Sequence, residues 1–127
     1  MRFLLDTHVL LWFLKGETRL PKAIRKKIED ATDVFISSAT ILEICIKTKS
    51  KKLEVDIPQL IQAMQDNDFT ELPITTQHAL AIFHLPNHHK DPFDQFLIAQ
   101  AISEPLILLT ADAHLKKYTD LVHVVDV

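Results

Sequence analysis

Four carboxylates interrupt or close apolar runs of this sequence, and their types and positions suggest metal chemistry. Two of them directly follow the mainly apolar residues 3–5 and 106–111. A third lies inside the apolar residues 41–46, and the fourth precedes residues 96–99. A charge beside a hydrophobic core is costly unless a partner pairs with it, so we expect the partner to be a cation. The four residues are Asp6, Glu43, Asp94 and Asp112.

A divalent metal is the cation that this set of side chains favours. Hard cations such as Mg²⁺ take oxygen ligands and keep several waters beside one or two carboxylates. In phosphodiester hydrolysis such ions generate hydroxide and neutralise the transition state and the leaving oxygen. Without metal, clustered acids repel one another and some acquire raised pKa values. The pattern therefore indicates phosphate chemistry, with a metal whose binding stabilises the fold.

The aspartates also have a structural interpretation at helix starts. Asp6 and Asp112 each precede a segment expected to be helical, where an aspartate caps the first turn. Asp91 is a good cap for a helix that begins with Pro92, and Asp94 three residues later gains from the helix dipole. Either interpretation suits each residue singly, so the metal hypothesis depends on all four acids together.

The position of Glu43 inside an apolar run is harder to explain without a metal site. It can pair with Lys47 at i, i+4 on a helix. An exposed pair of this kind contributes only about 0.3–0.5 kcal/mol, too little to account for a carboxylate among apolar neighbours. We therefore expect Glu43 to be buried and to have a partner.

The histidines suggest a different metal hypothesis. His84, His88 and His89 lie close together, but no Cys or Glu at matching spacing completes a zinc site, which favours a polar loop. His8 adjoins Asp6, yet on a helix the two side chains are expected to point in different directions. The lone glycine, Gly16, excludes a Walker A loop and a dinucleotide fingerprint, which each need several glycines.

Composition favours one globular domain over residues 1–127. Apolar residues make up 47% of the chain and charged residues 24%, as in an ordinary globular protein. No apolar stretch approaches the ~18 residues of a membrane span, and the start of the chain meets Asp6 too soon for a signal peptide. The single Cys45, in an apolar stretch, is expected to be a buried and inert thiol. We therefore expect a cytoplasmic protein with no membrane contact.

The net charge of −3 argues against a generally basic nucleic-acid-binding surface. Metal bound to the four acids would leave the rest of the surface net positive, so nucleic acid is not excluded. Basic residues cluster at residues 25–27 and at Lys47, Lys49, Lys51 and Lys52. Each cluster suits either phosphate contacts or a solvated helix end.

Short apolar strands alternating with helices predict an α/β fold with a mainly parallel central sheet. Ligands of such sheets bind beyond the carboxyl ends of the strands, where Asp6 and Asp112 are expected. Strands are predicted over residues 2–5, 34–36, 69–72, 106–109 and 122–125. Helices are predicted over 7–14, from Pro21 to about 31, after a cap at Ser37 or Ser38, from Ile57, from a cap at Thr75 or Thr76 through 84, from Asp91 to about 103, and over 111–117.

Four segments that carry these acids resemble the motifs of PIN-domain proteins. Residues 4–12 (LLDTHVLLW) are similar to the opening motif of that family, and residues 36–39 followed by 42–44 resemble its middle motif. Residues 89–101 and 109–112 resemble its third and fourth motifs. Their order and spacing extend the resemblance over essentially the whole chain.

The resemblance is to the small VapC toxins of bacterial type II toxin–antitoxin systems. It implies a PIN-like three-layer fold and a ribonuclease dependent on Mg²⁺ or Mn²⁺, dimeric and inhibited by a VapB-type antitoxin. It implies catalytic and metal-binding roles for Asp6, Glu43, Asp94 and Asp112, with Asp94 preferred to Asp91. Thr7, Ser38 and Thr110 are the hydroxyls expected around those ligands.

Two positions depart from the family pattern. Gln95 stands where similar sequences often have arginine, which removes a positive charge beside the expected site. Residues 49–53 lack the glycine that often precedes the leucine. Neither departure removes a metal ligand.

The leading hypothesis is a metal-dependent endoribonuclease toxin that uses water as its nucleophile. Asp6 and Asp94 are expected as principal ligands, with Glu43 and Asp112 holding a second ion or orienting the water. One alternative is a non-catalytic PIN-like binding module, which the acidic net charge favours. The other is a phosphoaspartate enzyme of the haloacid-dehalogenase type, which wants a second acid where this chain has His8.

Overall fold

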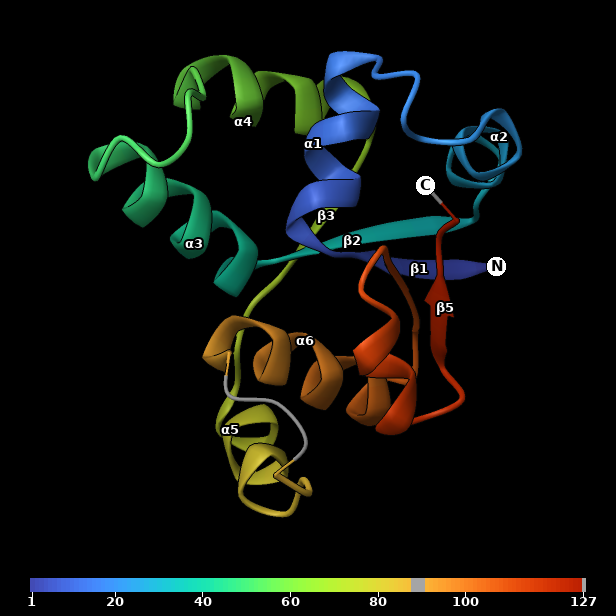
Figure 1. Cartoon of the computed structure of the whole chain (residues 1–127), viewed down its shortest axis with the longest axis vertical. Coiled ribbons are helices and arrows are strands. Elements are labelled where there is room, and N and C mark those ends of the chain that lie inside the picture. Colours follow the sequence, from blue (N-terminus) through green and yellow to red (C-terminus); the bar gives the residue numbers. More distant parts are fainter. Residues whose placement is uncertain (88–90, 127) are drawn as a thin grey trace.

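A parallel sheet forms the centre of the computed structural model, which describes residues 1–87 and 91–126 (Figure 1). The strand order is β3-β2-β1-β4-β5, and every neighbouring pair is parallel. This confirms the predicted α/β fold. The strands are β1 (Arg2–Leu5), β2 (Asp33–Ser37), β3 (Thr70–Leu72), β4 (Ile107–Thr110) and β5 (Val122–Val124).

Helices cover both faces of the sheet, which completes the expected three layers (Figure 1). Helices α1, α2 and α4 lie on one face and α5 and α6 on the other, while α3 extends from the carboxyl end of β2. The bounds are α1 (Thr7–Lys15), α2 (Lys22–Glu29), α3 (Ser38–Lys49), α4 (Ile57–Asp66), α5 (Thr76–Phe83), α6 (Pro92–Ser103) and a 3-10 helix η1 (Ala113–Lys117).

Alternation along β1 sends its side chains into two separate cores. Phe3 and Leu5 pack with α1, α2 and α4 on one face of the sheet. Leu4 packs on the other face, with α6, η1 and Leu108 of β4. Successive strand residues point to opposite faces, and both faces of a parallel sheet are buried. Both cores therefore meet at β1, the central strand.

The capping residues place most helix starts where the sequence predicts them. Ser37, Thr75 and Asp91 accept backbone N–H groups at the first turns of α3, α5 and α6. Two predictions differ in detail. Pro21 immediately precedes α2, because its extended backbone makes it the N-cap. The expected helix over 111–117 is the shorter η1, because Asp112 is its cap.

The prediction of a buried Cys45 is wrong, because its side chain is exposed. Leu42 and Ile46, on the same side of α3, are also 51% and 48% exposed. An apolar run on a helix covers the whole circumference, and here α3 buries only the face that carries Ala39, Thr40, Glu43 and Ile44. Among the described helices, none is long and apolar enough to cross a bilayer.

Helix α3 ends in a left-handed turn at Lys51. Lys51 has φ 63°, a left-handed conformation that disfavours side chains. The Lys51 and Lys52 amides donate to the carbonyls of Thr48 and Lys47, which is the hydrogen-bond pattern of a Schellman end. The chain thus keeps the left-handed turn with a lysine in it.

Lys51→Gly is expected to raise the free energy of unfolding by about 0.5–1 kcal/mol, because it relieves the left-handed strain. Urea denaturation monitored by circular dichroism measures the change. Lys27→Gly, at an exposed position in the last turn of α2, is the matched control and should lower stability by up to about 1 kcal/mol. Destabilisation by Lys51→Gly would contradict the explanation.

Candidate active site

An acidic pocket opens at the carboxyl ends of the parallel strands. The cavity measures about 510 Å³, and all four acids predicted from the sequence line it. Asp91, which the sequence assigns mainly to a helix cap, lines it as well. The acids come from the ends of β1 and β4 and from α3 and α6, and they are Asp6, Glu43, Asp91, Asp94 and Asp112.

The strand order explains why the pocket lies here. Chain connections run from β1 to β2 on one side, whereas β4 lies on the other side of β1. At such a reversal the connections diverge and leave a crevice above the strand ends. The Asp6 amide donates to the Leu109 carbonyl at 3.0 Å, which fixes Asp6 beside the end of β4.

Asp6 is a buried carboxylate held by two donors. Its Oδ1 accepts the Val9 amide at 2.9 Å and caps α1, while its Oδ2 accepts the Thr110 hydroxyl. The side chain is only 7% exposed. Burial raises the pKa of the Asp6 carboxyl, and the Thr110 and Val9 hydrogen bonds offset part of this effect. The ionised form is therefore costly without a cation nearby.

Thr110 joins two of the acids. Its hydroxyl donates to Asp6 and accepts the Asp112 amide at 3.1 Å. Asp112 Oδ1 accepts the His114 amide at 2.9 Å and caps η1. Asp112 therefore combines the capping role with a place in the pocket.

Glu43 is buried, as expected, and both of its oxygens have partners. The Thr7 hydroxyl donates to Oε1 at 2.5 Å, and Lys47 Nζ donates to Oε2 at 2.6 Å. The i, i+4 pair therefore forms, but inside the pocket. The hydrogen bond to Glu43 raises the pKa of the Lys47 ammonium, so Lys47 stays charged beside the acids.

The start of α6 distinguishes its two aspartates. Asp91 Oδ1 accepts the Phe93 amide at 2.9 Å, which makes Asp91 the N-cap. Asp94 lies in the first helical turn and also reaches the pocket. Its capping role is sufficient to explain why an aspartate stands at position 91. Asp94 does not cap the helix, and it lines the pocket from the first turn of α6.

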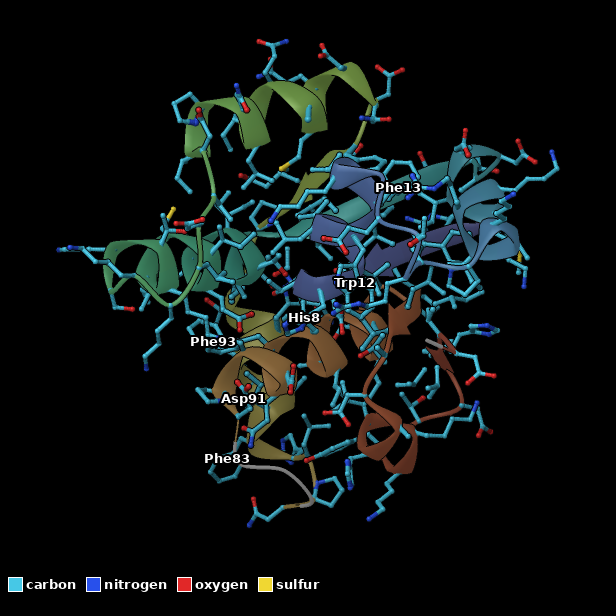
Figure 2. The ribbon with its side chains drawn as sticks, turned by 45° about the horizontal axis from the view of Figure 1, so that its top comes forward. His8, Trp12, Phe13, Phe83, Asp91 and Phe93 are labelled. Carbon is cyan, nitrogen blue, oxygen red and sulfur yellow. The ribbon has the colours of Figure 1, made fainter. Side chains whose placement is uncertain are left out.

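The sequence did not identify His8, Trp12 and Arg19 as residues that line the pocket. His8 and Trp12 are neighbours on α1, with ring centroids 5.9 Å apart (Figure 2). The Arg19 guanidinium lies 5.2 Å from the Trp12 ring centroid. His8 and Asp6 line the same pocket, although the sequence predicts different directions for their two side chains. The i, i+4 spacing of His8 and Trp12, just after the Asp6 cap, was the sequence signal that could have placed both side chains at the pocket.

Other candidates lie apart from the acids. Ser38 accepts the Ile74 amide at 3.1 Å, unlike Thr7 and Thr110, which contact the acids. The lysines beyond Lys47 are exposed around the end of α3. In the basic cluster at residues 25–27, Arg25 donates to the Phe13 carbonyl and so has a structural role. In the histidine group, His84 caps the end of α5, and His88 and His89 fall outside the described residues.

The donor set suits a hard divalent cation, because it consists of carboxylate oxygens around one pocket. Across residues 1–87 and 91–126, no three His, Cys, Asp or Glu side chains converge closely enough to hold an ion. Glu43 and Asp112 instead turn towards protein donors, Lys47 and His114. Joint coordination of a metal would therefore require some carboxylates to rotate.

The amino-acid sequence matches one protein family and a member of it. The model of the PIN domain matches residues 3–121. The chain is 28% identical over 118 residues to ribonuclease VapC22 of Mycobacterium tuberculosis, an alignment that covers 91% of this chain and 90% of that protein.

Solved structures share the fold at low identity. DNA-bound VapBC from Salmonella typhimurium matches with a TM-score of 0.70 and 18% identity, over 98% of this chain and 96% of that one. A toxin–antitoxin complex from Klebsiella pneumoniae matches with a TM-score of 0.69 and 20% identity, over 95% of both chains.

Asp6→Asn is expected to raise the free energy of unfolding of the metal-free protein at neutral pH, because it removes the buried negative charge. The pKa of Asp6 in the folded protein lies above the ordinary value of 3.8. The wild type therefore loses stability as the pH rises from 3.8 to the folded-state pKa. The benefit of the variant should therefore vanish below pH 3.8. Asparagine still accepts the Val9 amide as a cap.

Urea denaturation across pH measures this difference. Asp120→Asn, at an exposed aspartate, is the control and should change stability little at any pH. A loss of stability in metal-free Asp6→Asn at neutral pH would contradict the cost assigned to the buried charge.

Proposed function

Because the chain belongs to the PIN domain family, we propose that it is a metal-dependent endoribonuclease and the toxin of a VapBC-type toxin–antitoxin pair. The observation that carries the proposal is the convergence of five acids on one pocket at the reversal of strand order. Similarity to ribonuclease VapC22 supports RNA as the substrate.

Asp6 and Asp94 are the proposed principal metal ligands. Asp6 is fixed from both sides by Val9 and Thr110, so its position changes little when a cation binds. Glu43 and Asp112 complete the acidic set, and they hold a second ion or orient the attacking water. Bound Mg²⁺ or Mn²⁺ supplies charge neutralisation for the phosphodiester and activation of water.

The protein groups around the acids prepare them for this role. The hydroxyls of Thr7 and Thr110 orient Glu43 and Asp6, as partners of metal ligands commonly do. Water is the nucleophile, so no covalent intermediate with the protein forms. Lys47 supplies positive charge in the pocket, and Lys49, Lys51 and Lys52 guide RNA phosphates from the exposed end of α3.

A VapB-type antitoxin is the proposed protein partner. The similar structures from Salmonella typhimurium and Klebsiella pneumoniae are toxin–antitoxin complexes. A second cavity of about 320 Å³ lies between α1 and α4 and is lined by Leu11, Leu14, Val55, Leu60 and Ala63 among others. An apolar segment of an antitoxin fits such a groove.

A homodimer is proposed from the exposed apolar side chains of α3 and α5. Leu80 and Phe83 on α5 are 61% and 84% exposed, and Leu42 and Ile46 are exposed on α3. Helix α6 packs against both of these helices. Figure 2 shows Phe83 on the same side of the molecule as Phe93 of α6. Large exposed apolar groups that cluster in this way mark an interface.

Asp94→Asn is expected to lower RNA cleavage by about 100-fold or more, because it removes a charged metal ligand. Asp91→Asn is the matched control: asparagine caps α6 equally well, so cleavage should fall less than about 10-fold. Cleavage of RNA with Mg²⁺ or Mn²⁺ and calorimetry of metal binding measure both variants.

Two results would contradict the proposed function. One is wild-type protein that cuts no RNA with either metal, and the other is equal cleavage by Asp94→Asn and wild type. A calorimetric titration without divalent binding would favour the non-catalytic binding module.

Phe83→Ser is expected to weaken the homodimer by about 10-fold or more, as loss of a central aromatic anchor does. Sedimentation velocity over a concentration series measures the dissociation constant. Ile61→Ser, at an exposed isoleucine of α4, should leave it unchanged. Wild-type protein that stays monomeric at high concentration would contradict the dimer.

A further inference from the structure

One wall of the acidic pocket is aromatic and cationic. Trp12 is half-buried on α1, with His8 one turn earlier, and both line the cavity that the acids line. Figure 2 shows these two side chains together, near the start of α6 where Asp91 lies. Arg19 covers the indole from the loop after α1. The pocket thus joins a carboxylate set to a planar ring and a guanidinium.

The loop conformation that brings Arg19 to Trp12 is well defined. Gly16 ends α1 with φ 65°, a left-handed turn that reverses the chain. The Glu17 amide then donates to the Trp12 carbonyl at 3.0 Å, and Leu20 is buried at 2% exposure. Arg19 lies between these two anchors, so its backbone is held near the ring while its side chain is exposed.

We propose that Trp12 and Arg19 form a nucleotide subsite, in which the base next to the cleaved phosphodiester stacks on the indole and Arg19 contacts the adjoining phosphate. This inference rests on the proposed ribonuclease function, and it names the residues that hold the substrate. Sequence-tolerant binding of single-stranded RNA commonly combines aromatic stacking with backbone contacts of this kind.

The charges of the pocket support a role for Arg19. Five carboxylates repel an RNA backbone, so phosphates need cations at the rim. Lys47 is engaged by Glu43. Within residues 1–87 and 91–126, Arg19 makes neither a hydrogen bond nor an ion pair, and its guanidinium contacts the indole of Trp12. Its five N–H donors are therefore available to a phosphate.

Comparison with Arg25 shows that Arg19 is held less firmly on its ring. Arg25 also lies over a ring, that of Phe13, but its guanidinium donates to the backbone carbonyls of Phe13 and Trp12. Those bonds fix Arg25 in place. Arg19 rests on the indole by a cation–π contact alone, which is weak at an exposed site. A base can displace it, because base–aromatic stacking is the stronger interaction.

Fluorescence provides a direct test, because Trp12 is the only tryptophan of the chain. The Asp6→Asn protein with Mg²⁺ is titrated with a single-stranded RNA hexamer, so that binding is measured without cleavage. A matched abasic ribose-phosphate hexamer keeps the phosphates and lacks the bases. We expect saturable quenching of the indole by RNA and little quenching by the abasic oligomer.

Variants separate the two contacts. Arg19→Gln should weaken RNA binding about 5- to 10-fold, measured by anisotropy of labelled RNA. Arg2→Gln is the matched control, because Arg2 lies 5.3 Å from the Phe35 ring centroid but outside the pocket. Trp12→Phe should keep most of the affinity, whereas Trp12→Leu should lower it about 10-fold.

The outcomes distinguish this subsite from the proposed function. RNA that binds without quenching, with Arg19→Gln equal to Arg2→Gln, overturns the subsite even if the wild type cuts RNA. Quenching by RNA in a protein that cuts none supports the subsite and contradicts the nuclease. Absence of both binding and cleavage overturns both.

Discussion

The hydrogen bond from Thr110 to Asp6 is the contact on which the site depends. It joins residues 104 positions apart and ties the end of β1 to the end of β4. Asp6 also caps α1 through Val9, so one carboxylate marks the start of that helix and lines the pocket. Burial makes its charge costly. The fold therefore holds a destabilising group in place, as expected where function competes with stability.

Opposite charges line one pocket around this carboxylate. Acids from β1, β4, α3 and α6 line it together with Lys47 and the Trp12–Arg19 pair. Lys47 donates a hydrogen bond to Glu43. The metal-free pocket therefore already contains one positive charge that offsets the negative charge of its acids. Such an arrangement fits the proposed binding of a hard cation and of a flexible anionic chain. The small net charge of −3 does not reveal that acidic and basic groups meet in this pocket.

Local signals predicted the elements of the fold well. Apolar runs located the strands, and short polar side chains such as Thr75 and Asp91 marked where helices begin. The signals were weaker where a residue's environment depends on distant segments. Cys45 and Glu43 lie in the same apolar run of α3, yet the thiol is exposed and the carboxylate is buried. Which face of α3 packs inward is decided by the sheet and α6, and the run itself does not encode it.

The sequence by itself determined the types of the acids and their places at strand ends and helix starts, because period and capping are local properties. Only the tertiary structure decided which groups meet. The order β2-β1-β4 brings Asp6 beside Thr110, which lies 104 positions further along the chain. The spacing of these two residues in the sequence does not indicate that they are in contact. The contact arises from strand pairing and burial, which act on the whole fold at once.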